Sequence, residues 1–338
     1  MAVGGLLQSP SSFPHYPVCI LLIYIYRMEF LENEPMFAHT SFKVGGPARF
    51  FVKVETAAEL AQVHQKAEKT GLPCFLLGKG TNLLVSDSGF NGIVVQLGRS
   101  FSEIENLGNG RFRVGAAAPL ARFARVSLNQ GFAGVHKLAG IPGSLGGAVY
   151  MNAGAYGQEI CETCVEVVSM DAAGRMRMRT TAECKFSYRH SLFQELACRS
   201  TTESDMEVVL SAIFQLSPAA NFGKSKEELE REMLECMEKR RKSQPLGMPN
   251  AGSTFKRLAT GAAETPRQIA PGYYIEQAGL KGYRIGGAEV SQIHANFIVN
   301  TGGATACDIK NLIEFVQKDV FEKFGVQLTR EIILLGNF

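Results

Sequence analysis

The most unusual stretch of this chain is residues 140–159, where glycine is frequent and apolar residues separate the glycines. The spacing matches neither an amphipathic helix nor an alternating strand. Glycine gives up side-chain contacts and loses the most entropy on folding, so such clustering is typical of backbone that must approach a flat or anionic group, with its N–H groups as donors. The apolar residues argue against a flexible linker. The segment therefore predicts contact with a large cofactor, with a tight structural loop as the alternative.

A second glycine-containing loop, Gly78-Lys-Gly-Thr-Asn82, follows a predicted strand. It is not a Walker A loop, because Pro73 stands where the first glycine should be, and it is not a GxGxxG loop, because Leu83 holds the third glycine position. Its N–H groups and the Thr81 hydroxyl can still be donors to a pyrophosphate. Alone it fits an ordinary turn equally well, but both clusters together predict a dinucleotide held between two halves of a domain.

Three polar residues could do chemistry beside such a cofactor. Arg189 follows Tyr188, and a guanidinium is suited to bidentate binding of a carboxylate or phosphate, with a surface arginine as the alternative. Ser253 follows a glycine in a polar loop without a GxSxG elbow, which leaves hydrolase chemistry unsupported. Glu331 opens an apolar strand, where a carboxyl group either caps an edge or has a tuned pKa.

Composition places the chain among soluble globular proteins. The 338 residues are 46% hydrophobic and 20% charged, enough for a large core and two or three subdomains. A net charge of +3 gives no broad basic field, so no nucleic-acid partner is expected. The eight cysteines are scattered, which indicates reduced thiols in a cytosol. Cys161 and Cys164 form a lone CxxC without a second pair, so no metal site is predicted.

The remaining pattern predicts an α+β protein with a break after residue 217. Before the break, strands are expected at 49–54, 73–77, 93–97, 111–116, 165–170, 175–180 and 207–216, and helices at 56–69 and 119–130. After the break, helices are expected at 225–242, 273–278 and 306–324, and strands at 295–300 and 331–335. The apolar run at 18–26 is too short to span a membrane. We expect residues 1–27 to be an extension before an initiator at Met28.

Taken together, these motifs resemble the UDP-N-acetylenolpyruvoylglucosamine reductase family over about residues 40–338. The motifs that match, in chain order, are 40–47, 78–85, 140–147, 152–157, 188–189, 251–256, 279–282 with 286–287, 294–297, and Glu331. Each is modest, but nine in the right order make the resemblance specific. The segment after residue 297 has no additional tyrosine-bearing insertion, which is similar to the shorter subtype of the family.

The resemblance implies a fold and a cofactor. Residues 28–217 would form an α+β FAD-binding domain of the vanillyl-alcohol-oxidase (PCMH) type, in two subdomains, and residues 218–338 an α+β substrate-binding domain. Residues 1–27 are unmatched. FAD would bind non-covalently and NADPH would reduce it. The residues expected to bind the cofactor are Gly78, Gly80, Thr81, Asn82, Gly140, Ile141, Pro142, Gly143, Ser144, Gly146, Gly147, Asn152 and Gly154.

The resemblance also implies a reaction. The flavin N5 would pass a hydride to the methylene carbon of an enolpyruvyl ether, and a proton would reach the adjacent carbon. Arg189 would stabilise the developing charge, Ser253 would deliver the proton, and Glu331 would lie next to the same group. The residues expected to bind the UDP-sugar substrate are Tyr188, Arg240 (or Arg241), Asn250, Lys256, Lys281 and His294, of which His294 also fits a purely structural role.

Two other readings compete with this one. The first is another FAD-linked oxidase or dehydrogenase of the same fold, with flavin attached covalently through His39 or His136. The second is a catalytically inactive nucleotide-binding module. The combination of Arg189, Ser253 and Glu331 argues against both. We expect a monomeric cytoplasmic enzyme that has neither a membrane nor a nucleic acid as partner.

Overall fold

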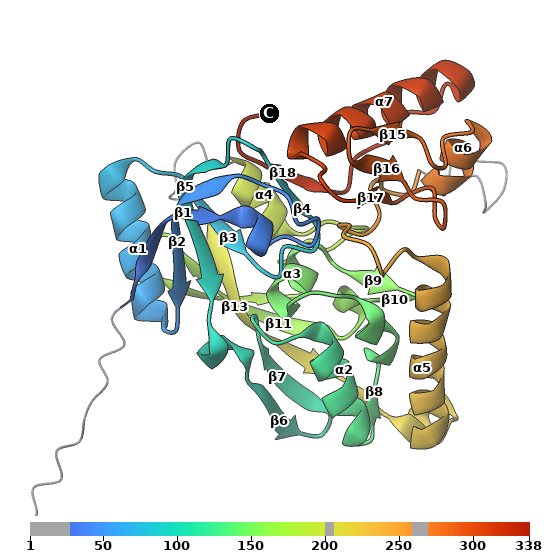
Figure 1. Cartoon of the computed structure of the whole chain (residues 1–338). Helices are drawn as coiled ribbons and strands as arrows, with labels where there is room; N and C mark the ends of the chain where they lie inside the picture. Colours follow the sequence, from blue (N-terminus) through green and yellow to red (C-terminus); the bar gives the residue numbers. More distant parts are fainter. Residues whose placement is uncertain (1–27, 200–205, 259–269) are drawn as a thin grey trace, which may run out of the picture.

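The described residues form two larger β-sheets with their helices and a smaller C-terminal unit (Figure 1). The computed structural model describes residues 28–199, 206–258 and 270–338, so the predicted extension at 1–27 lies outside the described residues. The mixture of helices and strands confirms the predicted α+β class. No helix in the described ranges is both long enough and apolar enough to cross a membrane.

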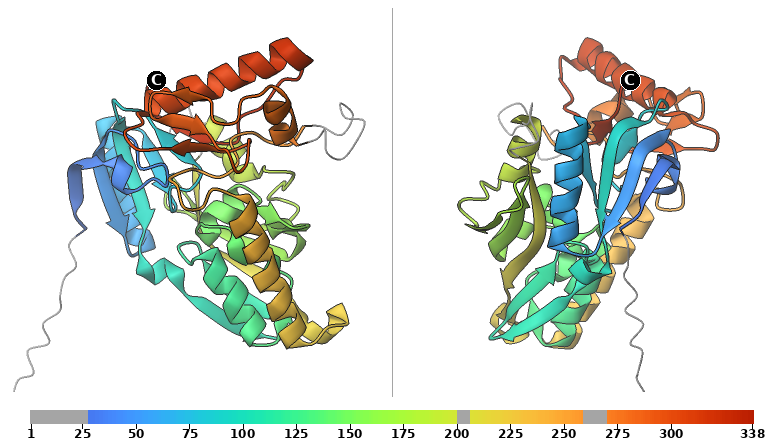
Figure 2. Two further views of the ribbon diagram at one scale, coloured as in Figure 1. Left: turned by 45° about the vertical axis from the view of Figure 1, so that its right-hand side comes forward. Right: turned by 90° about the vertical axis from the view of Figure 1, so that its left-hand side faces the viewer.

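The first sheet has the strand order β1-β2-β5-β3, with β1 antiparallel to β2 and the other neighbours parallel. Its strands are β1 (Phe30–Pro35), β2 (Pro47–Val54), β3 (Cys74–Leu77) and β5 (Phe90–Leu97). Helix α1 (Ala57–Thr70) begins at a capping box made by Thr56 and Glu59 and ends at Gly71 in the left-handed conformation, as start and stop signals of this kind predict. One core unites α1 with this sheet and with Met170 and Val208 of the second sheet. In the right-hand view of Figure 2, α1 (blue) lies between the two sheets.

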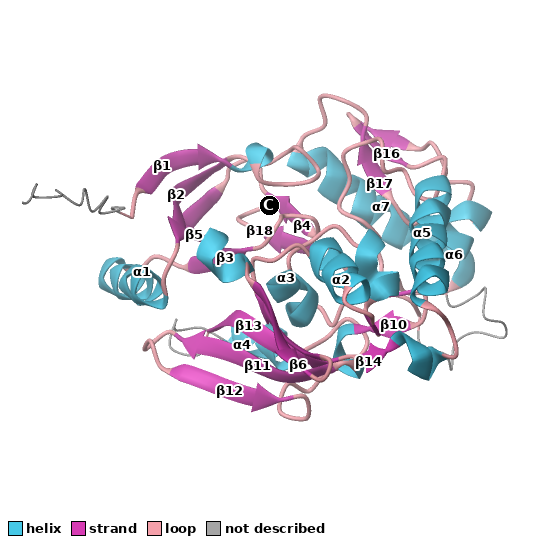
Figure 3. Cartoon of the chain, turned by 90° about the horizontal axis from the view of Figure 1, so that it is seen from below, coloured by secondary structure: helices cyan, strands magenta, loops and turns pink. Residues whose placement is uncertain are grey.

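The second sheet is antiparallel, with the order β12-β11-β13-β7-β6. Its strands are β6 (Ile104–Gly108), β7 (Arg111–Gly115), β11 (Cys164–Asp171), β12 (Met176–Thr180) and β13 (Glu207–Gln215). Helices α2 (Leu120–Asn129) and α3 (Leu145–Tyr150) share a core with this sheet (Figure 3), and α4 (Leu192–Arg199) packs against β13. The short pairs β8 (Phe132–Ala133) with β14 (Ser217–Pro218) and β9 (Gly154–Ala155) with β10 (Gln158–Glu159) complete this unit.

The C-terminal unit is a three-stranded sheet covered by two helices. Strands β15 (Arg284–Ile285), β16 (Ala288–Val290) and β17 (Ile298–Asn300) pair in that order. Helices α6 (Pro271–Gln277) and α7 (Ala306–Phe324) bury their apolar faces in the same core. The predicted strand at 295–300 is thus shortened to its last three residues, because the chain turns at His294 to Phe297 through a backbone hydrogen bond of 3.0 Å.

Helix α5 (Lys226–Ser243) packs away from that core. Its buried residues Leu229 and Met233 belong to the core of the second sheet, and it lies against α2 and the 3-10 helix at His136–Gly140. The predicted division after residue 217 stays a prediction. From this packing, we propose that the change of unit falls near residue 244, at the end of α5.

The chain finally returns to the first sheet unit. Strand β18 (Ile333–Leu335) pairs in parallel with β4 (Leu83–Val85). The carboxylate of Asp87 accepts from the backbone N–H groups of Ala306 and Cys307, at 2.8 and 2.9 Å, and so caps α7 from outside. These contacts hold the C-terminal unit against the loop that the sequence predicts to bind the cofactor.

The structure differs from the prediction most clearly at residues 140–159, where the spacing predicted no helix. Helix α3 forms within this segment despite Gly146 and Gly147. The Ser144 side chain accepts from the Gly147 N–H, and Leu145 and Val149 are fully buried. Capping and burial therefore outweigh the poor helix propensity of glycine.

We predict that His64→Leu flattens the pH dependence of stability. His64 is 2% exposed, and neither ring nitrogen has a hydrogen-bond partner among the described residues. Burial lowers the pKa of His64, while Asp171 opposes this effect. The unfolded chain therefore takes up a proton as the pH falls below about 6.5, and the folded chain does so only at lower pH, so stability is lost in that window.

The measurement is the free energy of unfolding by urea at several pH values between about 7 and 5. The variant should gain stability relative to the unaltered protein as the pH falls, by at most about 1.4 kcal/mol per pH unit. Parallel curves for the two proteins would show that His64 has no lowered pKa.

Candidate active site

A large cleft runs between the two sheets and the C-terminal unit. Its volume is about 2500 Å³, whereas a pocket for one drug-sized ligand is typically about 300–1000 Å³. The cleft thus has room for a dinucleotide and a second ligand together. It is lined by both glycine-containing segments and by all three predicted catalytic residues.

Most of the predicted cofactor residues line this cleft. Those that do are Gly78, Gly80, Thr81, Asn82, Ile141, Pro142, Gly143, Ser144, Gly146, Gly147 and Gly154. Gly140 and Asn152 do not line it. Gly140 lies against the side chain of Arg240, and the Asn152 side chain is fully buried.

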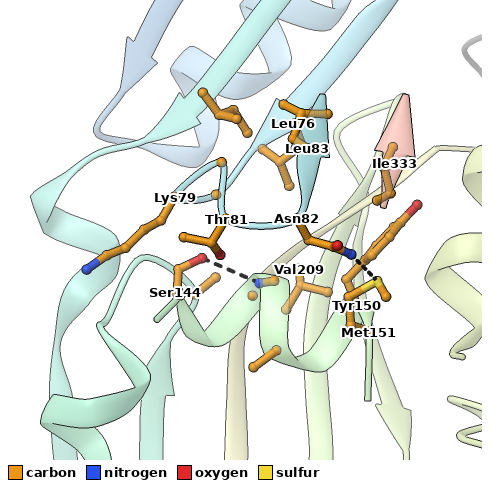
Figure 4. A pocket seen from close by; sticks show the side chains of 18 of the residues that line it. Leu76, Lys79, Thr81, Asn82, Leu83, Ser144, Tyr150, Met151, Val209 and Ile333 are labelled. Atoms are coloured by element: carbon orange, nitrogen blue, oxygen red, sulfur yellow. Dashed lines mark hydrogen bonds between the residues drawn. The ribbon is translucent and has the colours of Figure 1, made fainter. Parts of the chain in front are cut away.

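The two glycine-containing segments meet across the cleft (Figure 4). The Thr81 hydroxyl donates to the Pro142 carbonyl at 2.8 Å, and a Cβ at Gly78 would lie 2.8 Å from the Ser144 Oγ. In Figure 4 the Lys79 side chain extends away from this contact. Glycine backbone and hydroxyl groups lie close together at this point of a large cleft. This arrangement fits a phosphate-bearing dinucleotide such as FAD.

Gly80 has a second reason to be glycine. Its φ is +61°, and a Cβ there would lie 2.1 Å from the His39 carbonyl oxygen. The Gly80 carbonyl in turn accepts from the backbone N–H of Ser41 at 3.0 Å. Part of the glycine signal in the sequence therefore reflects close packing of the loop against residues 39–41 rather than contact with a ligand.

Arg189 and Glu331 form an ion pair inside the cleft. The Arg189 Nε donates to the Glu331 Oε1 at 3.1 Å, and both side chains are mostly buried. The guanidinium also donates through Nη2 to the Gly154 carbonyl at 2.7 Å and through Nη1 to the Asn152 carbonyl at 3.4 Å. Arg189 has a φ of +52°, so the turn that presents it is held in a conformation that non-glycine residues seldom adopt.

Two opposing effects act on the carboxyl group of Glu331. Burial raises its pKa, whereas the charges of Arg189, Lys256 and Arg257 lower it. The net direction is upward, because desolvation of this buried group is the largest effect. Such a group takes up a proton more readily than an exposed glutamate, most of all when another carboxylate lies next to it.

Ser253 lies on a loop whose shape is fixed by its neighbours. The Asn250 side chain accepts from the Gly252 N–H at 2.9 Å and donates to the carbonyls of Pro245 and Met248. Beyond the serine, the Thr254 carbonyl accepts from the Glu331 N–H at 2.8 Å. One backbone hydrogen bond therefore joins the residue after Ser253 to Glu331. All three predicted catalytic residues line the same cleft.

The predicted substrate-binding residues divide into two groups. Arg240 lines the cleft. The others do not line it: Tyr188, Asn250, Lys256, Lys281 and His294. Tyr188 accepts from the Arg257 N–H, and Lys281 pairs with Glu276 at 2.9 Å. Burial and the charge of Lys281 lower the pKa of His294.

Arg240 lines the cleft with a buried guanidinium nitrogen that has no partner among the described residues. That nitrogen is Nε, and no described carboxylate lies within ion-pair distance of the guanidinium. Burial lowers the pKa of this guanidinium, and Tyr156 opposes the shift. A part-buried guanidinium without a protein partner is suited to an anionic ligand.

Among the other residues that line the cleft and that the sequence did not single out as site residues are Tyr156, Gln244 and Arg257. Tyr156 belongs to the Asn-Ala-Gly-Ala-Tyr-Gly motif, and Arg257 follows the Phe-Lys motif, so proximity to a motif was the available signal. Gln244 had no signal beyond its place after α5. Its Oε1 is buried without a described partner.

The two histidines considered for covalent flavin attachment lie elsewhere. His39 stacks on Phe51 and contacts Glu34, and neither His39 nor the buried His136 lines the cleft. The geometry thus gives no support to the covalent oxidase alternative.

Comparisons with known proteins agree on one family. Residues 244–335 match the family model described as UDP-N-acetylenolpyruvoylglucosamine reductase, C-terminal domain, and residues 48–178 match that of an FAD binding domain. A relative named UDP-N-acetylenolpyruvoylglucosamine reductase, from Caldanaerobacter subterraneus subsp. tengcongensis, is 42% identical over 310 residues, which cover 90% of this chain and 93% of the relative. A protein of the same name from Heliobacterium modesticaldum is 40% identical over 312 residues, which cover 92% of each chain.

A solved structure supports the same family. The crystal structure of the UDP-N-acetylenolpyruvylglucosamine reductase from Thermus caldophilus aligns with a TM-score of 0.73 and 31% sequence identity. The alignment covers 92% of this chain and 99% of that structure.

We predict that Gly80→Ala destabilises the protein far more than Gly71→Ala does. Both glycines have nearly the same positive φ, +61° and +64°, but a Cβ at Gly71 would meet nothing within 4 Å. Backbone strain alone should therefore lower the free energy of unfolding of the Gly71 variant, by about 1 kcal/mol. The Gly80 variant must also push the His39 carbonyl away, which should add at least about 1 kcal/mol and lower the amount of bound flavin.

Urea unfolding of both variants, with flavin absorbance per protein, makes the comparison. Equal losses of stability for the two variants would show that the loop does not pack against residue 39 as described.

Proposed function

Because the chain belongs to the UDP-N-acetylenolpyruvoylglucosamine reductase family, we propose that Arg189, Ser253 and Glu331 perform the charge stabilisation and proton transfer of that reaction. The protein is an FAD-dependent oxidoreductase of peptidoglycan synthesis that reduces the enolpyruvyl ether of UDP-N-acetylglucosamine with NADPH. The observation that supports the residue assignment most strongly is the buried Arg189–Glu331 pair, one backbone hydrogen bond away from the Ser253 loop.

FAD, when bound, supplies the redox chemistry, in which a hydride from NADPH reaches the enolpyruvyl methylene carbon. We assign its phosphates to the loop at 78–82 and to residues 141–147, because these segments face each other across the cleft. The remaining steps belong to the side chains of the protein.

Contacts with the protein fix the Arg189 guanidinium and leave some of its N–H groups available for the substrate. An arginine has five N–H donors, and three of them are directed to Glu331, Gly154 and Asn152. The two that remain, one on each Nη, can bind the substrate carboxylate. When hydride addition pushes negative charge toward that carboxylate, the fixed guanidinium stabilises it without having to reorganise.

Ser253 provides the proton. A serine hydroxyl is a weak acid, so it protonates only a strongly basic centre, such as the carbon next to the carboxylate after hydride addition. The new C–H bond at that carbon forms as the serine O–H bond breaks. The hydride and the proton together complete the saturation of the double bond.

Glu331 acts in its protonated form in the complex. Its pKa is already raised by burial, and a substrate carboxylate bound by Arg189 raises it further. A protonated carboxyl group can donate a hydrogen bond to the charge that develops beside it, whereas an ionised one would repel that charge.

The positive groups around the cleft suit an anionic nucleotide sugar. Arg240 has no described carboxylate partner, and we assign it to the diphosphate of the substrate. Arg257 lies beside Glu331 and lines the cleft, which makes it a second candidate for an anionic group. Lys256, Lys281, His294, Tyr188 and Asn250 stay predictions for substrate binding, with Asn250 shaping the Ser253 loop.

We also propose a cytoplasmic location. Cys161, Cys164, Cys184, Cys236 and Cys307 are free thiols, and three of these five are buried, as is usual in a reducing compartment. The monomeric state stays a prediction.

Replacing Ser253 should separate the two halves of the reaction. Ser253→Ala should leave the bleaching of the flavin by NADPH within about twofold of the unaltered rate. Recovery of the oxidised flavin absorbance on addition of UDP-N-acetylglucosamine enolpyruvate should slow by about 10²- to 10⁴-fold, because the proton donor is gone.

Rapid-mixing absorbance under anaerobic conditions measures both phases, with Ser217→Ala on the exposed short strand β14 as control. Unchanged recovery in Ser253→Ala would remove the serine from the mechanism. Failure of the unaltered protein to recover with substrate would contradict the function itself.

A further inference from the structure

Asn152 has a different environment from the other residues of the glycine-containing segment. It follows the end of α3, its φ is +40°, and its side chain is completely buried. Asparagine tolerates this left-handed conformation better than most residues do. The side chain does not reach the cleft, so its polar atoms must be satisfied within the protein.

Every polar atom of the Asn152 side chain has a partner. Its Oδ1 accepts from the Cys161 N–H at 3.1 Å. Its Nδ2 donates to the Glu159 Oε2 at 3.0 Å and to the Ser187 carbonyl at 3.0 Å. The amide orientation is set by these partners, because a backbone N–H faces the oxygen while a carboxylate and a carbonyl face the nitrogen.

The bond to Ser187 connects Asn152 to the turn that carries Arg189. Ser187 and His190 close this turn by two backbone hydrogen bonds, at 3.1 and 3.0 Å. Arg189 sits inside it with a φ of +52°. Strained backbone of this kind persists only where its surroundings hold it in place, and the Asn152 amide supplies one such contact.

The Arg189 guanidinium returns to the same segment. It donates to the carbonyl of Asn152 and to that of Gly154. Hydrogen bonds thus connect both the Arg189 turn and the Arg189 side chain to residues 152–154. On the other side of the turn, the Gln194 Nε2 donates to the carbonyls of Arg189 and Tyr150, at 3.1 and 2.8 Å.

From these contacts we propose that Asn152 is a positioning residue for Arg189, fixing the turn of residues 187–190 against the segment that lines the cofactor cleft, with Gln194 holding the opposite side. This inference rests on the proposed function, in which Arg189 stabilises the charge on the substrate. It gives Asn152 a role other than the cofactor contact that the sequence predicts.

The consequence for catalysis is specific to one half of the reaction. A guanidinium that is displaced even slightly loses its fit to the charge that develops in the transition state. Reduction of the flavin by NADPH develops no charge on a substrate carboxylate. A defect in Asn152 should therefore slow the second phase and spare the first.

The test uses Asn152→Asp in the FAD-loaded full-length protein. This substitution keeps the size of the side chain, an acceptor for the Cys161 N–H and tolerance of the left-handed conformation. It replaces both donors of Nδ2 by an acceptor that faces the Glu159 carboxylate and the Ser187 carbonyl, so both contacts are lost. The matched control is Asn109→Asp, at an exposed turn between β6 and β7 with a φ of +51°. The second variant is Gln194→Glu, which removes the Nε2 donor to the carbonyls of Arg189 and Tyr150.

In rapid-mixing experiments, Asn152→Asp should lower the limiting rate of flavin reoxidation by UDP-N-acetylglucosamine enolpyruvate by about 10- to 100-fold per bound flavin. The substrate concentration for half-saturation should change by less than about threefold, and the limiting rate of bleaching by NADPH by less than about twofold. Gln194→Glu should show a smaller effect with the same pattern, and Asn109→Asp should match the unaltered protein.

Equal slowing of both phases in Asn152→Asp, or loss of flavin with normal rates per bound flavin, would overturn the proposal and return Asn152 to a structural or cofactor-binding role. If Asn152→Asp does not fold, selective slowing of reoxidation in Gln194→Glu supports the proposal, and its absence overturns it. Failure of the unaltered protein to reoxidise with substrate would contradict the proposed function instead, so the two failures are distinguishable.

Discussion

The ion pair between Arg189 and Glu331 is the contact on which the rest of the site depends. It joins residues 142 positions apart, one from a turn beside the second sheet and one from the C-terminal segment. Burying two charges is costly unless further hydrogen bonds compensate, and removing one partner leaves the other uncompensated. The carbonyls of Asn152 and Gly154 provide that compensation for the guanidinium. The pair therefore forms only when both units are folded and docked.

Glu331 is held in this position by hydrogen bonds to the loop at 78–82, which we assign to the cofactor. The Asn82 amide donates to the Glu331 carbonyl at 3.2 Å, and the Asn82 carbonyl accepts from the Ile333 N–H at 3.1 Å. The Thr254 carbonyl holds the Glu331 N–H from the opposite side. The loop at 78–82, the Ser253 loop and the last strand thus make one continuous hydrogen-bonded frame. A change in any of the three shifts the carboxyl group relative to Arg189.

The sequence predicted helices α1 and α7, whose ends carry local signals. Helix α1 has its cap at Thr56 and its stop at Gly71, and α7 begins with an equivalent capping box at Thr305. Helix α3 was missed because capping by Ser144 and burial in the second-sheet core overcome glycine propensity, and neither is visible in a local window. Short strands such as β17 were misjudged in length because their ends are set by turns.

The assembly of the site depended on contacts that no local pattern encodes. Asn82 and Glu331 are 249 positions apart, and only the resemblance to a family placed them in one site. Even the resemblance did not give the orientation of Asn152, whose side chain turns away from the cleft toward the Arg189 turn. The segment of residues 152–154 thus also holds the side chain of Arg189 through its backbone carbonyls.

A double-mutant cycle on the oxidative half-reaction tests most directly whether Arg189 and Glu331 act as one unit. The limiting rate of flavin reoxidation by substrate is measured for the unaltered protein, Arg189→Lys, Glu331→Gln and the double variant. If the pair acts as a unit, the rate of the double variant should lie within about threefold of the rate of the slower single variant. If the two losses multiply, the residues act independently and the account of the ion pair as the organising contact is wrong.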